Sequence, residues 1–258
     1  MSDGAGREGT LRRLGLVPTV ADLLREALGT AVGRADLEHE RAGHARPAVT
    51  ALDAGCGRRS ALAPFRRHLA QVVGVDLHEP AGGPSPTLDL FVTADLCRDG
   101  SAFAPQTFDL ALSSFTLEHL TDPAAALANL ARWLRPGGSL VLATVNRRHP
   151  FVAAYLGLPP GARRRLQPVV KASPADAHPL VGGCNVPAAL RSALAGAGFA
   201  EIELRTVGNL ARAWRRRGPT FALGITGDLL TRSMPARRST IVVTARAAGG
   251  PPAAVTAS

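Results

Sequence analysis

Short apolar runs, separated by glycine, proline and charged residues, recur along the chain. Five of them are rich in β-branched or aromatic residues and bounded by turn residues, as buried strands are: Val49–Leu52, Gln71–Asp76, Leu88–Thr93, Phe108–Ser113 and Ser139–Val145. Apolar residues at helical spacing predict helices over Val20–Val32, Ala61–Leu69 and Pro123–Leu134. Strands that alternate with helices in this way indicate a parallel sheet covered on both faces.

The pattern changes after the fifth strand. Residues 147–183 are irregular and rich in Arg, Pro and His, which favours a lid or a substrate-binding insertion. A helix over Val186–Ala197 follows, with further strands over Phe199–Val207 and Ser239–Arg246. We therefore predict an α/β fold with a Rossmann-like, doubly wound, seven-stranded and mostly parallel sheet that carries helices on both faces.

These elements form a single domain with short appendages. Residues 1–18 are rich in glycine and charge and are expected to be flexible, and residues 247–258 are expected to form a disordered tail. The domain spans residues 19–246. It contains a polar link over 33–46, a ligand-binding core over 48–146, and insertions over 147–184 and 208–238 that are expected to shape a second pocket.

Composition is that of a globular protein, with 258 residues of which 46% are hydrophobic and 19% are charged. The sequence has no run of about 18 apolar residues and no apolar signal core at its N-terminus, so we expect a cytoplasmic protein. Cys56, Cys97 and Cys184 are far apart and form no CxxC pair. Neither a disulfide framework nor a metal site is therefore predicted.

The net charge of +10 raises the question of a nucleic-acid partner. Aromatic residues make up only 4% of the chain, which leaves few platforms on which bases could stack. Lys171 is the sole lysine, and the arginine clusters at 163–165, 215–217 and 237–238 read as solvated faces. These observations argue against nucleic acid as a partner.

A membrane surface is a separate alternative. The segment Trp214–Met234 mixes arginines with an apolar run, as segments that lie on membranes do. A helix that packs on the sheet with arginines at its ends explains the same pattern, and we favour it. The sequence does not indicate an oligomeric state.

The stretch Asp53-Ala-Gly-Cys-Gly57 is the strongest candidate for a ligand site. Gly55 and Gly57 allow backbone angles and close approaches that a Cβ would forbid, so a ligand can lie on the main chain at the end of the first strand. A dinucleotide fingerprint needs a third glycine, and Ser60 stands in its place. An acid directly before the turn also suits an ammonium group better than phosphates.

A second carboxylate is expected at the same edge of the sheet. Asp76 ends the second predicted strand, and consecutive parallel strands of a βαβ unit bring their carboxyl ends together. From that position Asp76 can accept hydrogen bonds from both hydroxyls of a ribose.

Taken together, these motifs resemble those of class I S-adenosylmethionine-dependent methyltransferases. More narrowly, they are similar to the small-molecule branch related to ubiquinone and menaquinone biosynthesis methyltransferases. The resemblance covers residues 48–146 well and Asn185–Glu203 weakly. It rests on the order and spacing of five segments: Leu52–Gly57, Val73–Asp76, Ala94–Leu96, Phe108–His119 and Leu134–Gly138.

The resemblance implies S-adenosyl-L-methionine as the cofactor and a set of residues that bind it: Asp53, Ala54, Gly55, Cys56, Gly57, Asp76, Leu77, Asp95, Leu96, Ser114 and Phe115. The turn would hold the aminoacyl end, Asp76 the ribose hydroxyls, and Leu77 would lie beside the adenine. Asp95 would accept from the adenine amino group, unless it serves as a turn or N-cap residue. Ser114 and Phe115 would face the methionine portion and the acceptor.

Methyl transfer from a sulfonium is an in-line displacement, so the protein mainly positions the acceptor and excludes water. A hydroxyl acceptor also benefits from a general base. The candidates are His119, Glu118, His149 and His178. His119 lies just past the fourth strand, where a structural or cofactor-side role is the alternative, and the other two histidines lie in the first insertion.

The expected function is methyl transfer to O, N or C of a small-molecule acceptor, such as a secondary metabolite, a sugar or a lipid-linked intermediate. RNA or protein methylation is an alternative suggested by the charge. However, Ser113-Ser-Phe-Thr116 stands where amino-methylating nucleic-acid enzymes often carry Asp/Asn-Pro-Pro-Tyr/Phe. A non-catalytic S-adenosylmethionine-binding domain is a further alternative, against which the intact set of cofactor residues argues.

Overall fold

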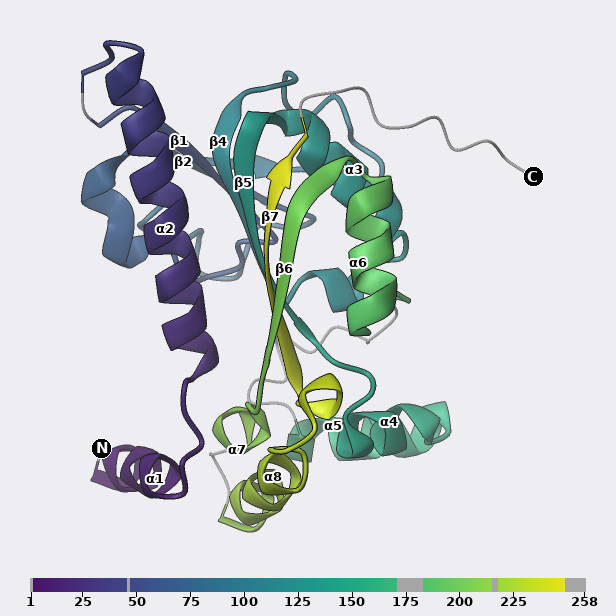
Figure 1. The fold of residues 1–258 in the computed structure, drawn as a ribbon. Helices are drawn as coiled ribbons and strands as arrows, with labels where there is room; N and C mark the ends of the chain where they lie inside the picture. Colours follow the sequence, from purple (N-terminus) through teal and green to yellow (C-terminus); the bar gives the residue numbers. More distant parts are fainter. Residues whose placement is uncertain (1, 46, 171–182, 215–217, 249–258) are drawn as a thin grey trace.

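The computed structural model describes residues 2–45, 47–170, 183–214 and 218–248 (Figure 1). Within these residues, seven strands form one sheet in the order β3-β2-β1-β4-β5-β7-β6. The strands are β1 (Val49–Ala54), β2 (Leu69–Asp76), β3 (Leu90–Thr93), β4 (Phe108–Ser114), β5 (Leu134–Val145), β6 (Phe199–Val207) and β7 (Thr240–Ala247). The first five pair in parallel, and β7 lies antiparallel between β5 and β6. This sheet confirms the predicted fold class.

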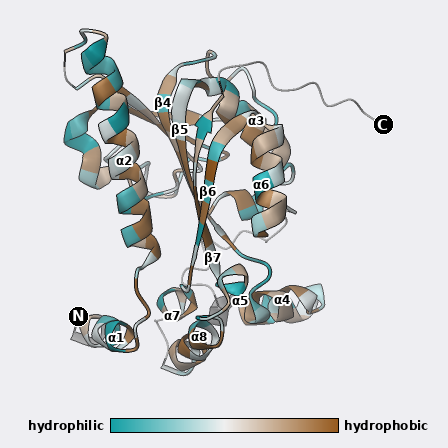
Figure 2. Cartoon of the chain, viewed as in Figure 1, coloured by the Kyte–Doolittle hydropathy of each residue, from teal (hydrophilic) through white to brown (hydrophobic). Residues whose placement is uncertain are grey.

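Helices cover both faces of the sheet, as Figure 1 shows. Helix α2 (Val20–Arg41) lies on one face, where Leu28 and Val32 pack with Leu110 and Val141 in a buried core. Helices α3 (Pro123–Trp133) and α6 (Pro187–Gly196) lie on the other face, over a second core. Figure 2 shows apolar residues concentrated along the strands between these two layers.

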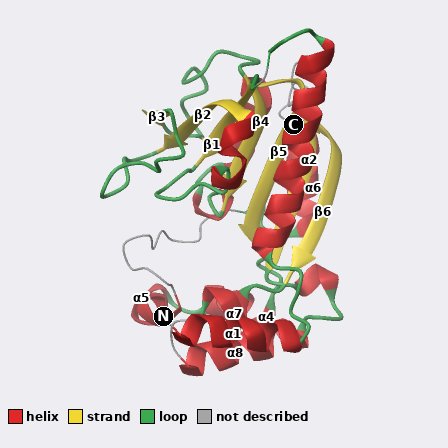
Figure 3. Cartoon of the chain, turned by 90° about the vertical axis from the view of Figure 1, so that its left-hand side faces the viewer, coloured by secondary structure: helices red, strands yellow, loops and turns green. Residues whose placement is uncertain are grey.

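A third group of helices lies across the carboxyl edge of the parallel strands (Figure 3). They are α1 (Ser2–Arg13), α4 (Pro150–Gly157), α5 (Pro160–Val170), α7 (Leu210–Ala213) and α8 (Gly218–Leu230). We call them the edge layer. They come from the N-terminal segment and from the two predicted insertions, so parts of the chain that are distant in sequence meet at the edge where ligands bind in open α/β sheets.

The N-terminal half differs from the prediction in two places. Residues 1–18, which were expected to be flexible, are mostly occupied by α1, which buries Leu11 against Ala211. Helix α2 does not end at Val32 but continues to Arg41 through the predicted link. The extension is anchored at its last turn, where His39 Nε2 lies 3.0 Å from Asp109 Oδ1.

The first predicted crossover helix is also corrected. In place of an α-helix over Ala61–Leu69 there is a 3₁₀ helix, η1 (Ala63–His68). Pro64 lies in its first turn and has no backbone N–H to continue an α-helical ladder. Arg66 Nη1 donates to Leu69 O at 2.7 Å, which ties the short segment directly to the start of β2.

The predicted irregular segment 147–183 contains α4 and α5, both of which begin at a proline. Strand β5 begins at Leu134 rather than at Ser139, directly after α3. As expected, Asp122 caps α3, because its Oδ1 accepts from Ala125 N at 3.0 Å. Residues 171–182 and the predicted tail from residue 249 lie outside the described residues.

Candidate functional site

The turn after β1 has the backbone geometry that its glycines predict. Gly55 has φ +75° and Gly57 has φ +49°, both in the left-handed region. A Cβ on Gly55 would lie 2.1 Å from Thr116 Oγ1, so Thr116, the second residue after β4 (Phe108–Ser114), fits against bare main chain here. The turn is also held to β2, since Gly55 N donates to Val75 O at 2.8 Å.

Asp53 lies beneath this turn at the end of β1 and is only 3% exposed. Burial raises the pKa of its carboxyl group to about 7. A hydrogen bond with Ser60 lowers this pKa, and the negative charge of Asp76 raises it by a smaller amount. Its Oδ2 is buried and has no hydrogen-bond partner among the described residues. A buried carboxylate oxygen without a donor is costly, so this atom is a place where a cationic ligand group would be stabilised.

Asp76 lies at the end of the neighbouring strand, as predicted. Its Oδ2 accepts from Gly57 N at 3.0 Å and its Oδ1 accepts from Leu77 N at 2.8 Å. The two carboxylates, Asp53 and Asp76, therefore flank the same turn from adjacent strands. Leu77 is 52% exposed, which leaves its apolar side chain available to a ligand at this edge.

Asp95 has the turn geometry that the sequence left as an alternative to a ligand role. Its Oδ1 accepts from Cys97 N at 2.8 Å, and its Oδ2 lies 3.8 Å from Arg98 Nε. Leu96 is buried, and its carbonyl accepts from Asn129 Nδ2 at 2.9 Å. The segment is thus fixed by its own hydrogen bonds at the end of β3, beside Asp76.

Ser114 and Phe115 leave the end of β4 beside the turn. Phe115 has φ +57°, an uncommon backbone conformation for a non-glycine residue, and its N–H donates to Ala143 O at 2.7 Å. Its ring packs against the core under α2. The next residue, Thr116, then reaches Gly55, where its Oγ1 lies 3.3 Å from Gly55 O.

A buried polar network that the sequence did not predict lies behind these residues. Thr144 Oγ1 donates to Glu118 Oε2 at 2.8 Å and accepts from Asn185 Nδ2 at 3.2 Å. Glu118 and Asn185 are each 2% exposed, and Asn185 Oδ1 has no hydrogen-bond partner among the described residues. The three side chains come from η2 (Leu117–His119), from β5 and from Asn185, two residues before α6, so no spacing in the sequence links them.

The three candidate histidines have different positions. His119 ends η2 beside the polar network and is partly exposed at the carboxyl edge. His149 is fully buried: its Nδ1 accepts from Phe151 N at the start of α4, and its Nε2 lies 3.3 Å from Gly227 O. Burial lowers the pKa of its imidazole. His149 thus caps α4, its role toward an acceptor stays a prediction, and His178 lies outside the described residues.

Cys56, inside the turn, is buried, and burial raises the pKa of its thiol to about 12, with further contributions from Asp53 and Asp76. The thiol therefore stays neutral and fills space under the turn. Among the described residues there is no cluster of His, Cys, Asp and Glu that could hold a metal ion. No helix in the described ranges is long and apolar enough to cross a membrane.

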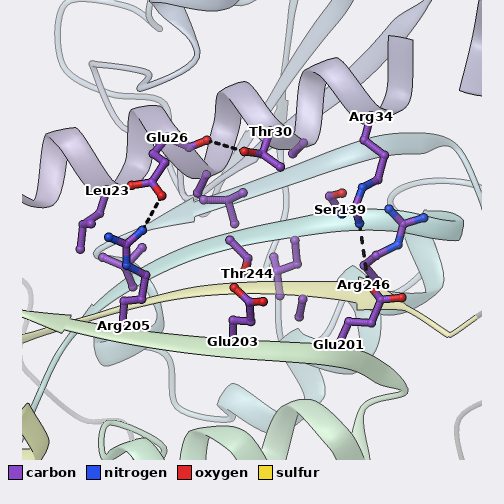
Figure 4. Close-up of a pocket in the computed structure, with 16 residues that line it drawn as sticks. Leu23, Glu26, Thr30, Arg34, Ser139, Glu201, Glu203, Arg205, Thr244 and Arg246 are labelled. Carbon is purple, nitrogen blue, oxygen red and sulfur yellow. Dashed lines mark hydrogen bonds and ion pairs between the residues drawn. The ribbon is translucent and has the colours of Figure 1, made fainter. Parts of the chain in front are cut away.

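A cavity of about 210 Å³ lies elsewhere, between α2 and the strands β5, β7 and β6 (Figure 4). Two ion pairs cross it: Arg205 Nη1 lies 2.7 Å from Glu26 Oε1, and Arg34 Nη1 lies 3.7 Å from Glu201 Oε2. The carboxyl ends of β1 and β2 do not line it. We therefore regard it as the gap between α2 and the edge of the sheet, outside the candidate site.

Comparison with known proteins agrees with the geometry of the turn. A family model described as a methyltransferase domain matches residues 20–204. A ubiquinone biosynthesis O-methyltransferase of Bradyrhizobium is 37% identical over 117 residues, which are 41% of this chain and 44% of that protein. A protein of the same name from Hahella chejuensis is 33% identical over 131 residues, covering 48% of this chain and 54% of its own length. The chain thus spans about half the length of these curated relatives.

Solved structures share the fold. A geranyl diphosphate C-methyltransferase from Streptomyces coelicolor, in complex with Mg²⁺, geranyl diphosphate and S-adenosyl-L-homocysteine, has a TM-score of 0.51 and 15% identity. The comparison covers 83% of this chain and 77% of that one. The matched family model includes the turn, both strand-end carboxylates and all strands from β1 to β5. The chain therefore belongs to the methyltransferase-domain family.

Proposed function

We propose that the protein is an S-adenosyl-L-methionine-dependent methyltransferase with a small-molecule acceptor. The observation that carries the proposal is the buried Oδ2 of Asp53, which has no donor among the described residues and lies under a glycine turn. The α-ammonium group of the cofactor would donate the hydrogen bond that this oxygen lacks, and its positive charge would strengthen that bond. The curated relatives named above, both O-methyltransferases, support the same assignment.

The residues present fit the cofactor. The left-handed glycines leave the main chain open above Asp53, and Asp76 stands at the end of the next strand to accept from ribose hydroxyls. Leu77 would lie against the adenine, and Leu96 would donate to the ring through its backbone N–H. When bound, S-adenosyl-L-methionine supplies an electrophilic methyl group on a sulfonium; the protein's contribution is to hold the acceptor in line with it and to exclude water.

We further propose that the edge layer forms the acceptor pocket. The segments 147–184 and 208–238 supply four of its helices, and these lie across the carboxyl edge of the sheet where β4 and β5 end (Figure 3). Glu118 and Asn185 are buried at that end of the sheet. Carboxylate and amide oxygens accept hydrogen bonds, so they suit an acceptor that carries hydroxyl or amino groups.

Methylation of RNA or protein and a non-catalytic cofactor-binding role remain as competing functions. The test is to incubate the protein with methyl-labelled S-adenosyl-L-methionine and a cell extract, before and after treatment of the extract with nuclease or protease. We expect label in a low-molecular-weight product that survives both treatments. Label lost on digestion would identify a macromolecular acceptor, and binding without any labelled product would identify a non-catalytic domain.

Asp76→Ala tests the cofactor assignment. The change removes the charged acceptor for the ribose hydroxyls, so we expect the affinity for S-adenosyl-L-methionine to fall by about 1–3 kcal/mol in calorimetry. Glu79→Ala is a matched control, because it removes the same charge from an exposed residue nearby and is expected to bind normally. Equal affinities of the two variants would remove Asp76 from the site.

His119→Ala tests the general base. If an acceptor hydroxyl is deprotonated by His119, turnover falls about a hundredfold or more while cofactor affinity is retained. His39→Ala is a control for loss of an imidazole at the opposite edge of the sheet, where His39 pairs with Asp109. Turnover of His119→Ala close to that of the unmodified protein would assign His119 a structural role.

A further inference from the structure

A second cavity, of about 430 Å³, lies outside the cofactor site. It is bounded by residues 15–18, which connect α1 to α2, by residues 204–208 at the end of β6, and by the segment after α8. Strands β4, β5 and β7 separate it from β1, so it is at the far end of the carboxyl edge. Three arginines line it: Arg205, Arg232 and Arg238.

Two of these arginines have no acidic partner in the part of the chain that the structure describes. Arg238 donates only to backbone carbonyls, to Arg232 O at 2.8 Å through Nη2 and 3.3 Å through Nε, and to Thr206 O at 3.1 Å through Nη1. Arg232 donates through Nη1 to Leu14 O at 3.3 Å. Neither forms an ion pair with a carboxylate among the described residues, whereas Arg205 pairs with Glu26. A guanidinium group has five donors, so both arginines keep donors for a ligand.

The single acid that lines the cavity does not neutralise them. Both carboxylate oxygens of Asp228 are already engaged: Oδ2 accepts from Ala211 N at 3.0 Å, and Oδ1 accepts from Leu210 N at 3.2 Å. These donors are the first amides of α7, and Asp228 is 1% exposed. Asp228 is the only acid among the lining residues, and Arg232 and Arg238 together carry more charge than it does, so the cavity has an excess of positive charge.

We propose that this cavity is a binding site for a small phosphate-bearing molecule. Guanidinium groups recognise phosphate through forked hydrogen bonds. Arg232 and Arg238 come from the segment after α8 and Arg205 comes from β6, so several guanidinium donors meet in one cavity, which suits a tetrahedral group with several terminal oxygens better than a planar carboxylate. Apolar lining residues, among them Leu16, Val17 and Leu204, would contact the body of the ligand. The site does not depend on the methyl-transfer assignment.

Such a ligand would link three segments of the fold. Arg232 already holds the carbonyl of Leu14, and Arg238 holds the end of β6, so an anion shared by the two would fasten the connection before α2 to both. Helix α1 and the edge layer would be stabilised in their places.

The test is a titration of the protein with inorganic phosphate at constant ionic strength, with chloride and acetate as comparison anions, followed by calorimetry and amide hydrogen exchange. We expect saturable phosphate binding, weaker binding of acetate, and slower exchange at residues 14–18 and 204–208. Arg232→Gln is expected to weaken phosphate binding about tenfold or more. Arg237→Gln, which removes an exposed charge that does not line the cavity, is the matched control and should bind normally.

Three results would overturn the proposal. They are the absence of saturable phosphate binding, protection of amides only elsewhere in the chain, and equal affinities of the Arg232→Gln and Arg237→Gln variants. Acetate binding as tight as phosphate would overturn the ligand class. Arg232→Lys, which keeps the charge but loses the fork, provides a second variant if Arg232→Gln does not fold, and intermediate affinity is expected. Anionic vesicles form a last arm: binding of vesicles without binding of inorganic phosphate would replace the small molecule by a lipid surface.

Discussion

At the scale of single residues, the site contains a buried polar group that lacks a hydrogen-bond partner within the described residues and a turn with uncommon backbone angles. Asp53 is a buried acid, and one of its oxygens has no hydrogen-bond donor within the described ranges. Gly55 and Gly57 hold backbone conformations that other residues adopt at a cost. The sequence predicted Asp53, Asp76 and both glycines, because a strand end followed by a glycine turn is a local pattern. It did not predict Ser60 as the partner of Asp53, since Ser60 was read only as a missing third glycine.

Asp53 makes cofactor binding dependent on pH. Burial raises the pKa of this acid from 3.8 to about 7. The unfolding free energy of the cofactor-free protein therefore falls as the pH rises between these values, because Asp53 ionises in the unfolded chain while it stays protonated in the folded one. The ionised form is the one that binds an ammonium group. We therefore expect the affinity for S-adenosyl-L-methionine to rise with pH up to about 7, by at most about tenfold per pH unit, and then to level off.

Calorimetry in buffers of different ionisation enthalpy measures this effect, because binding near pH 7 should release a proton. Asp53→Asn keeps the shape of the side chain and removes the titration, so it should bind more weakly and without this proton release. Affinity that is flat from pH 6 to pH 8 in the unmodified protein would rule out a titrating Asp53 as the ammonium partner.

The two turn glycines provide a matched pair of substitutions. A Cβ on Gly55 meets Thr116 Oγ1 at 2.1 Å, whereas a Cβ on Gly57 has no atom within 4 Å. Both have positive φ, so Gly57→Ala measures backbone strain of about 1 kcal/mol, and Gly55→Ala should lose a further 1–3 kcal/mol of unfolding free energy through the collision. Equal losses of unfolding free energy in the two variants, measured by urea unfolding, would show that Thr116 moves away from the new Cβ without an energetic cost.

At the scale of elements, strands were predicted better than helices. Apolar β-branched runs such as those of β2 and β7 identify buried strands from their own composition, whereas α1 is polar along most of its length and becomes a helix through contacts made far away in sequence. Arg212, only 12% exposed, binds both carboxylate oxygens of Glu8, and Leu11 is buried beside Ala211. No local sequence pattern around Glu8 predicts that it pairs with Arg212.

Strand β6 is a second element whose structure depends on residues distant in sequence, because arginine side chains bind its carbonyl groups. It is the outer strand of the sheet on its side, next to β7, and its free edge presents carbonyl groups. Arg191 Nη1 donates to Ile202 O at 2.6 Å and Arg238 Nη1 donates to Thr206 O at 3.1 Å, and the strand is irregular at Glu201, with φ +47°. Capped carbonyls and a local irregularity both hinder edge-to-edge pairing with another sheet.

The docking of α1 can be tested through its ion pair. Glu8→Gln leaves the largely buried guanidinium of Arg212 without its charged partner, and we expect a loss of about 1–3 kcal/mol in unfolding free energy. The control is Arg25→Gln, which breaks the exposed ion pair between Arg25 and Asp22, in which the arginine side chain is 62% exposed. Arg25 is changed instead of Asp22 because Asp22 also takes part in the cap of α2. The control should change stability by less than about 1 kcal/mol. Similar losses in both variants would mean that Arg212 does not anchor α1.

At the scale of the whole molecule, the candidate functional residues lie together at the carboxyl edge of the parallel strands. The glycine turn, both strand-end carboxylates and the network of Glu118, Thr144 and Asn185 all lie there, facing helices from both ends of the chain (Figure 3). The alternation of strands and helices predicted the sheet and its cofactor edge. It could not predict the edge layer, because the positions of α1, α4 and α8 are set by tertiary contacts and not by periodicity.

The most direct test of this account is a calorimetric titration of the protein with S-adenosyl-L-methionine and, separately, with a nicotinamide dinucleotide. The account predicts saturable heat with the sulfonium compound, loss of most of that heat in Asp53→Asn, and no binding of the dinucleotide. Heat with the dinucleotide and none with S-adenosyl-L-methionine would contradict it.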